Sequence, residues 1–382
     1  MIPRELEHRA RELATKFPIV AFVGPRQAGK STLARMAFPD YAYVNLEKPD
    51  IRTLAARDPN SFLKAYDEKV IIDEVQQVPE LFSYLQAKVD EDGVCGQFVI
   101  SGSRNFLLME KISQSLAGRV AILNVLPFSR FELSEAGHAP ADLDAWLLAG
   151  GYPRIYDKQI SPTDYYPFYI QTYLERDVRS IAAVGSIDSF RRFMQLCAGR
   201  TGCLLNMAAL AADAGIDTRT AKRWMSILQE SFIVTLLPPY FKNFSKRLVK
   251  SPKLYFCDTG LACSLLGLRS EDDVAFSPYK GALFENLVYN EFAKRNEARG
   301  RHENAWFWHE TSSNEVDFLF GFEHDLQAVE AKSGQTFTLS WFKSMKVFTE
   351  LADVGAENRL VVYGGDETLQ TSKGKIVSWR DW

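Results

Sequence analysis

The fold is decided by the stretch VAFVGPRQAGKSTL, residues 20–33. An apolar run leads into a loop that matches the pattern G-x-x-x-x-G-K-[S/T] at every fixed position, and a helical segment, residues 31–36, follows. Glycines let the main chain curl closely around phosphate groups, so that several N–H groups point at one anion. A plain glycine turn is the alternative, but the order strand, loop and helix predicts a phosphate-binding loop in an α/β sheet.

The loop and the helix after it supply the expected ligands of a nucleoside triphosphate. Lys30 would reach the β- and γ-phosphates, the Ser31 hydroxyl would bind Mg²⁺, and the helix would add the positive end of its dipole. The predicted cofactors are therefore ATP and Mg²⁺. The predicted ATP-binding residues are Gly24, Pro25, Arg26, Gln27, Ala28, Gly29, Lys30, Ser31 and Thr32.

Two acidic residues follow a strand that we expect beside this loop. Helical stretches separate most of the apolar runs, which favours a parallel sheet with helices on both faces. In such a sheet the carboxyl end of the third strand would place Asp73 to hold Mg²⁺ through water and Glu74 to orient and polarise the attacking water. Taken alone, two acids after a strand are usually a solvated turn. The predicted strands are residues 19–23, 41–46, 70–73, 97–101 and 120–125.

Three further side chains are candidates for the reaction. Ser103 could touch the γ-phosphate or the attacking water, or it could belong to a simple turn. Arg119, before the fifth strand, could sense phosphate or pair with a carboxylate. Arg176 lies between two acids in an aromatic segment, residues 147–180, that predicts a helical lid packed by its rings. It could stabilise charge on a neighbour's γ-phosphate, although a local ion pair competes with that role.

Length and composition limit the class of protein. A chain of 382 residues exceeds one ordinary core, and its 46% hydrophobic and 24% charged residues are typical of soluble globular domains. The net charge of −3 excludes a global basic field, so contact with nucleic acid must be local. The five cysteines form no CxxC pair, which argues against a zinc site or a disulfide frame and favours a reduced, cytoplasmic setting. We expect no membrane contact, because no long uncharged apolar run is present.

The middle of the chain predicts a winged helix. Residues 210–224 indicate a helix, a turn at Gly215 and a second helix, and the β-rich runs 232–237 and 253–257 follow. Basic side chains on the second helix and in the connection, which also carries Lys253, would attract phosphates without reading sequence. The predicted partner is therefore DNA, recognised by its structure; the alternative is packing on the nucleotide domain or a partner subunit. The predicted contacts are Arg219, Lys222, Arg223, Lys242, Lys246, Arg247 and Lys250.

The last third of the chain carries a second set of polar residues. Residues 315–320 and 326–332 predict two strands, which bring Asp317 beside Glu330 and Lys332 if they pair as a hairpin. Two carboxylates at one point could hold a second Mg²⁺ or a Mn²⁺, and a lysine there could position or deprotonate water.

This spacing of an acid and then E-x-K resembles the core of restriction-type nucleases. Glu285, in an expected amphipathic helix that begins at residues 281–288, matches the acid that their first helix often supplies. A helix over residues 339–351 and a strand over residues 359–363 continue the resemblance. Related domains keep this fold without cleaving nucleic acid, so nuclease activity stays open.

Several short motifs together resemble one family, the bacterial and archaeal AAA-type ATPases whose C-terminal half was long filed as a domain of unknown function. This resemblance extends over nearly the whole chain and implies ATP hydrolysis by a P-loop domain that tends to form homo-oligomers. It names no substrate. The motifs are GPRQAGKST, VIIDEVQ, SLAGR, LPFSRFE, GGYP and YLERDV, which begin at residues 24, 70, 115, 126, 150 and 173.

We therefore expect an α/β multidomain protein whose ATP turnover is coupled to engagement of DNA ends, junctions or single strands. One alternative is a nucleotide-gated interaction protein whose inactive nuclease-like domain is a docking surface. Another is a signalling ATPase without DNA contact. The expected domains are a P-loop ATPase core at 1–130, a helical lid at 131–185, a winged helix at 186–262 and a restriction-endonuclease-like α/β domain at 263–382.

Overall fold

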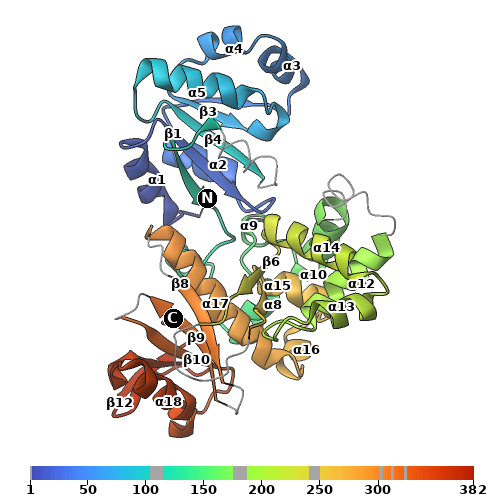
Figure 1. The fold of residues 1–382 in the computed structure, drawn as a ribbon, viewed down its shortest axis with the longest axis vertical. Coiled ribbons are helices and arrows are strands. Elements are labelled where there is room, and N and C mark those ends of the chain that lie inside the picture. Colours follow the sequence, from blue (N-terminus) through green and yellow to red (C-terminus); the bar gives the residue numbers. More distant parts are fainter. Residues whose placement is uncertain are drawn as a thin grey trace. The chain divides into compact units, whose positions relative to one another are not determined.

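The chain forms two compact units (Figure 1). Unit 1 comprises residues 1–128 with residues 230–232 and 297–300, and unit 2 comprises residues 129–229, 233–296 and 301–382. The computed structural model describes residues 2–103, 115–174, 187–240, 250–300, 304–310, 314–321 and 325–382. Four residues of the predicted sites lie outside these ranges, namely Arg176, Lys242, Lys246 and Arg247.

Unit 1 contains a sheet of five parallel strands in the order β2-β3-β4-β1-β5. The apolar runs in the sequence correspond to these strands, so the predicted parallel sheet is confirmed. Their bounds are Ile19–Gly24 for β1, Ala42–Asn45 for β2, Val70–Asp73 for β3, Phe98–Ser103 for β4 and Val120–Asn124 for β5.

Helices cover both faces of this sheet because successive strand residues point to opposite sides. On one face, Ile72 and Ile100 pack with apolar residues of α3 to α5; on the other, Phe22 and Val99 pack with those of α1 and α2. The helices are α1 (Leu6–Ala14), α2 (Lys30–Ala37), α3 (Pro49–Arg57), α4 (Pro59–Ala65) and α5 (Leu81–Asp92). A short 3₁₀ turn, η1 (Val75–Gln77), follows β3.

The parallel register brings three strand ends to one edge of the sheet. Gly24, the last residue of β1, lies opposite Ser103, the last residue of β4. Asp73, the last residue of β3, lies opposite Ser101 of β4 and Asn45 of β2. The phosphate-loop motif and the acidic pair therefore lie at the same edge.

Unit 2 begins with helices that pack through tyrosine rings. The rings of Tyr152, Tyr165, Tyr166 and Tyr169 lie in one buried cluster, with centroid separations between 4.8 and 5.9 Å. The prediction that the aromatic residues pack a helical segment is confirmed. Its elements are α7 (Arg130–Glu135), α8 (Leu143–Ala149), α9 (Pro153–Asp157), α10 (Pro162–Tyr169) and a π-helical turn, η2 (Ile170–Leu174).

A helix-turn-helix and a two-stranded antiparallel sheet follow. The turn contains Gly215 at a φ of 71°, and Asp217 caps the second helix by accepting a bond from the Thr220 N–H at 2.9 Å. The antiparallel register pairs Val234 with Phe256. The elements are α12 (Ile187–Ala198), α13 (Met207–Ala214), α14 (Thr218–Glu230), β6 (Val234–Leu237) and β7 (Lys253–Phe256).

The C-terminal part of unit 2 contains a mixed sheet of six strands in the order β12-β13-β11-β10-β9-β8. The expected antiparallel pair, β9 (Glu315–Gly321) and β10 (Gln327–Lys332), is present. So is the expected parallel strand β11 (Arg359–Tyr363). The sequence interpretation missed the strands β8 (Asn304–His309), β12 (Leu369–Thr371) and β13 (Gly374–Ser378).

Helices accompany this sheet. The helix expected at residues 339–351 consists of a 3₁₀ turn, η3 (Leu339–Phe342), and then α18 (Lys343–Ala352). A second 3₁₀ turn, η4 (Ala356–Asn358), precedes β11. The remaining helices are α15 (Thr259–Leu265), α16 (Glu271–Ala275) and α17 (Lys280–Ala298). Among the described helices, none is both long and apolar enough to cross a bilayer.

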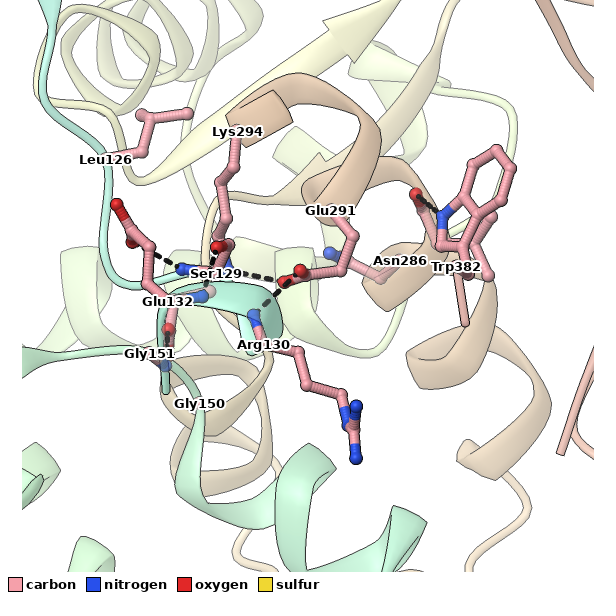
Figure 2. A network of polar contacts seen from close by, with 12 residues as sticks. Leu126, Ser129, Arg130, Glu132, Gly150, Gly151, Asn286, Glu291, Lys294 and Trp382 are labelled. Atoms are coloured by element: carbon pink, nitrogen blue, oxygen red, sulfur yellow. Dashed lines mark hydrogen bonds and ion pairs between the residues drawn. The ribbon is translucent and has the colours of Figure 1, made fainter. Parts of the chain in front are cut away.

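The helix α17 is buried on several sides, so the expectation of an amphipathic helix was wrong. Figure 2 shows the polar contacts that surround it. Glu291 accepts a hydrogen bond from the Arg130 N–H at 2.9 Å and pairs with Lys294 at 2.9 Å. The start of α7 is fixed by a capping box, in which the Ser129 and Glu132 side chains each accept the other's backbone N–H. The C-terminal part of the LPFSRFE motif is therefore hydrogen-bonded to α17 through Glu291.

A buried carboxylate joins the tyrosine-rich helices to α15. Asp258 caps α15 by accepting the Leu261 N–H at 3.0 Å, and it also accepts the Gly151 N–H at 2.8 Å and the Tyr166 hydroxyl at 2.7 Å. A side chain at Gly150 would overlap this carboxylate, which explains the first glycine of the GGYP motif. Removing the carboxylate would leave the Gly151 and Leu261 N–H groups without this acceptor, whereas the Tyr166 hydroxyl would keep its bond to the Ala149 carbonyl at 2.8 Å.

We predict that Asp258→Ala lowers the free energy of unfolding of unit 2 by about 3 kcal/mol, because buried donors are left without an acceptor. Urea denaturation followed by tryptophan fluorescence measures this loss, since all seven tryptophans lie in unit 2. Asp217→Ala, which removes an exposed helix cap in the same unit, is the control and should cause a smaller loss. Equal losses in the two variants would show that the buried hydrogen bonds of Asp258 contribute no more to the free energy of unfolding than an exposed helix cap does.

Candidate active site

The phosphate-loop motif has the backbone conformation that tight curling requires. Gly24 has a φ of 152° and Gly29 a φ of 92°, and Gln27 also adopts a positive φ of 62°. A Cβ atom at Gly24 would collide with the carbonyl group of Val125. Glycine is therefore required at the first position for space as well as for conformation.

Lys30 lies inside the loop. Its side chain is 6% exposed, and its ammonium group donates to the carbonyl oxygens of Gly24 at 3.1 Å and Pro25 at 2.7 Å. The helix α2 begins at Lys30, so Ser31 and Thr32 belong to its first turn, whose N–H groups have no acceptor within the helix. The loop, the ammonium group and the start of the helix together form a positively charged site suited to phosphate groups.

Asp73 is held by two hydroxyl groups that the sequence interpretation missed. The carboxylate is 3% exposed and accepts the Tyr43 hydroxyl at 2.5 Å and the Ser101 hydroxyl. One signal was available for Ser101, because a parallel register places the residue two before Ser103 opposite Asp73. Nothing local marks Tyr43, which comes from the edge strand β2.

Glu74 follows in a left-handed conformation, with a φ of 55° and a ψ of 44°. Its carboxylate accepts a hydrogen bond from the Gln76 amide. Burial raises the pKa of Glu74, and the positive charge of Lys30 opposes that rise. A non-glycine residue held in this conformation marks a position where the structure over-determines the backbone, as is common at functional sites.

Of the three weaker candidates, Ser103 and Arg119 lie in the described part of the chain and Arg176 lies outside it. Ser103 lies at the correct edge, opposite Gly24 in the register. Arg119 directly precedes β5, and its carbonyl accepts the Ile19 N–H, so it lies at the opposite edge from the loop. Its guanidinium group pairs with Asp90 at 2.5 and 2.7 Å. The phosphate-sensing interpretation of Arg119 was therefore wrong within this chain, and the structural ion pair is present.

The basic residues of α14 lie on one exposed face. Arg219, Lys222 and Arg223 are all exposed, while Ala221 and Trp224 are buried against the neighbouring helices. Lys250 is also exposed. The α14 spacing of three and four residues places the three charges on the same side of the helix.

The four residues of the nuclease-like constellation come together in unit 2. Lys332 pairs with Glu330 at 2.5 Å and lies 3.9 Å from Asp317. Asp317 also accepts the Ala331 N–H at 2.9 Å. Glu285, from α17, lies close enough for its charge and that of Asp317 to affect each other. We call Glu285, Glu315, Asp317 and Glu330 the carboxylate centre.

Burial and mutual repulsion shape this centre. Burial raises the pKa of Glu285 and of Glu330, and the charge of Asp317 raises both further. Among the described residues, no group of three or more His, Cys, Asp and Glu side chains is arranged to hold a metal ion. The structure therefore gives no support to the expected second Mg²⁺ or Mn²⁺.

Lys253 was expected to belong to the basic connection, but it lies in β7 and its side chain is buried. It is 3% exposed, and its ammonium group lies 2.9 Å from Glu285, 2.6 Å from Glu315 and 3.8 Å from Asp317. The expectation that it contributes to an exposed basic surface was wrong. The sequence gives no sign of this contact, because its partners follow 32 to 64 residues later in the chain.

Three family models match successive parts of the chain. An AAA domain matches residues 16–134, which contain the phosphate loop and the acidic pair. A domain of unknown function, DUF8612, matches residues 140–272, and another, DUF4143, matches residues 280–382. The AAA domain implies ATP as a cofactor.

Two relatives are similar to this chain over most of its length. Uncharacterized protein Rv2008c of Mycobacterium tuberculosis and Uncharacterized protein Mb2031c of Mycobacterium bovis are each 30% identical over 374 residues, which cover 97% of this chain and 81% of theirs. The Walker-type ATPase PABY2304 of Pyrococcus abyssi is similar in structure, at 14% identity and a TM-score of 0.47, over 69% of this chain and 96% of that one. The family assignment depends on the two mycobacterial sequences. The chain belongs to the same family as these mycobacterial proteins, and it is an AAA-type P-loop ATPase.

Proposed function

We propose that ATP hydrolysis in unit 1 is coupled to engagement of DNA by unit 2. One observation supports the proposed ATP hydrolysis. The phosphate loop, which encloses the Lys30 ammonium group, lies at the same edge of the sheet as Asp73 and Glu74. The observation that supports the DNA half is the exposed basic face of α14. The expected DNA features are ends, junctions or single strands, because phosphate contacts do not read sequence.

Each residue of the ATP site has a proposed role. Lys30 would leave the loop carbonyls to bind the β- and γ-phosphates, while the backbone N–H groups of Gly24 to Thr32 surround them. Ser31 and Asp73 would hold Mg²⁺, which when bound neutralises phosphate charge. The Tyr43 and Ser101 hydroxyls would fix the Asp73 carboxylate in position. Glu74 would orient and polarise the attacking water, and Ser103 would contact the γ-phosphate or that water.

The DNA-binding part is proposed to be a winged helix. The order of the elements supports this proposal, because the helices α12, α13 and α14 are followed by the antiparallel strands β6 and β7. Arg219, Lys222, Arg223 and Lys250 would contact phosphates, together with the three connection residues outside the described ranges. The proposed domains are an ATPase core at residues 1–130, a helical lid at 131–185, a winged helix at 186–262 and a C-terminal domain at 263–382.

The C-terminal domain is proposed to be nuclease-like in fold. The meeting of Glu285, Asp317, Glu330 and Lys332 supports that proposal, and the mixed order of the sheet is compatible with it. Cleavage is not required for coupling, since a nuclease-like domain can serve as a docking surface. By its resemblance to AAA-type ATPases the protein is expected to act as a homo-oligomer, with Arg176 as a candidate for a γ-phosphate contact in a neighbouring subunit.

We predict that two substitutions separate ATP binding from ATP hydrolysis. Lys30→Ala should weaken ATP binding and abolish turnover, because the phosphates lose their principal cation. Glu74→Gln should bind ATP with near wild-type affinity and hydrolyse it about 100-fold or more slowly, because the amide cannot polarise water. Calorimetric titration with ATP and a phosphate-release assay measure the two properties.

Matched controls come from the same unit. Lys64→Ala and Glu80→Gln change exposed residues of the same types and should leave both properties unchanged. Identical binding by Lys30→Ala and Glu74→Gln would contradict the assigned roles, as would wild-type turnover in either variant.

We also predict that the triple variant Arg219→Ala/Lys222→Ala/Arg223→Ala binds branched and single-stranded DNA at least about tenfold more weakly than wild type. The reason is that each lost phosphate contact removes counterion release, so the dependence of affinity on salt should also become shallower. Fluorescence anisotropy at several salt concentrations measures both effects.

The control is Lys343→Ala/Lys346→Ala/Lys373→Ala, which removes the same charge from other exposed positions of unit 2. Equal weakening in the two triple variants would show that net charge alone attracts DNA. If wild-type protein binds no DNA and its ATPase rate ignores DNA, a signalling ATPase with a protein partner is the better interpretation.

A further inference from the structure

A buried lysine occupies the middle of the carboxylate centre. Lys253, from β7, is 3% exposed and lies within 4 Å of carboxylate oxygens from three residues, two of them on β9 and one on α17. Carboxylates gathered at one point repel one another and need a cation between them. The cation that the structure shows there is the Lys253 ammonium group.

The surroundings of Lys253 are specific to this contact. The Tyr255 hydroxyl, two residues further along β7, donates to the same Glu285 oxygen at 2.5 Å. Asn286, the next residue of α17, is fully buried and bonds both backbone groups of Phe256, at 2.7 and 2.6 Å. The contacts of Lys253 and Tyr255 with Glu285, and of Phe256 with Asn286, therefore fix β7 against α17 and hold the ammonium group in place.

Two lysines already neutralise part of the negative charge in the centre. Burial by itself would lower the pKa of Lys253, but the charges of Glu285, Asp317 and Glu315 outweigh burial and raise it. Lys332 provides a second positive charge beside Glu330 and Asp317. A divalent cation entering the centre would meet a buried ammonium group among its intended ligands, and like charges at such short range in a buried site repel strongly.

We propose that Lys253 is a built-in cation that closes the carboxylate centre to divalent metal ions, so that β7 acts as an autoinhibitory strand for the nuclease-like site. The centre binds Mg²⁺ or Mn²⁺ only after the ammonium group is withdrawn or removed. This inference rests on the proposed nuclease-like site, but it does not depend on the coupling of ATP hydrolysis to DNA. It needs neither nucleotide nor nucleic acid for its test.

The experiment uses the full chain without nucleotide and titrates it with MnCl₂, reading bound Mn²⁺ from the loss of the free-ion electron paramagnetic resonance signal. We expect wild type and Asp317→Asn to bind Mn²⁺ equally weakly. Lys253→Met, which keeps the volume and removes the charge, should bind Mn²⁺ at least about tenfold more tightly than wild type. The double variant Lys253→Met/Asp317→Asn should lose that gain.

A second measurement separates closure from a general structural role. Without metal, Lys253→Met should have a lower Tm by tryptophan fluorescence, because three carboxylates lose their cation, and Mn²⁺ should restore part of the loss. The double variant should show no such Mn²⁺-dependent rise. Lys253→Arg, which keeps the charge, should bind Mn²⁺ as weakly as wild type.

Two results would overturn the proposal. One is Mn²⁺ binding by wild type that Asp317→Asn abolishes, because the centre would then be open with the lysine present. The other is a folded Lys253→Met protein that binds no more Mn²⁺ than wild type. If Lys253→Met does not fold, Lys253→Gln takes its place, and the comparison of wild type with Asp317→Asn still tests the proposal.

Discussion

The structure of unit 1 depends on one constraint, the parallel register of β3, β4 and β1. Because the three strands run in the same direction, their carboxyl ends meet at one edge. This register brings the phosphate loop after β1 beside the Asp73 and Glu74 pair after β3, although some forty residues separate them in the chain. The same register places Arg119, the residue before β5, at the opposite edge of the sheet from the phosphate loop.

A different principle organises unit 2, where buried polar groups fix how its segments pack. Asp258 satisfies donors from three segments, Asn286 pairs with the backbone of β7, and Glu291 holds the start of α7 (Figure 2). Buried polar groups of this kind specify one arrangement, because any other would leave them without partners. Lys253 belongs to the same class, and its charge also determines what else the carboxylate centre can bind.

The sequence predicted those parts of the site that lie within one continuous stretch and have a recognisable residue pattern. The glycine-rich loop, the five apolar strands and the acidic pair are each continuous in the chain, and periodicity also predicted the hairpin that carries Asp317 and Glu330. Contacts between distant segments were not predictable in this way. The Tyr43 and Ser101 bonds to Asp73 need the register of the whole sheet, and the burial of Lys253 needs the packing of β7 on α17. A lysine in a basic stretch looks like a surface residue until its partners are known.

If the main chain from Gly24 to Thr32 surrounds the phosphates of ATP, its N–H groups donate hydrogen bonds to them. Amide hydrogen exchange with and without a non-hydrolysable ATP analogue and Mg²⁺ measures this protection most directly. We expect strongly slowed exchange in peptides that cover residues 24–32, with smaller slowing around Asp73 and Glu74. Unchanged exchange in the loop, at analogue concentrations that saturate binding, would contradict phosphate binding by the loop.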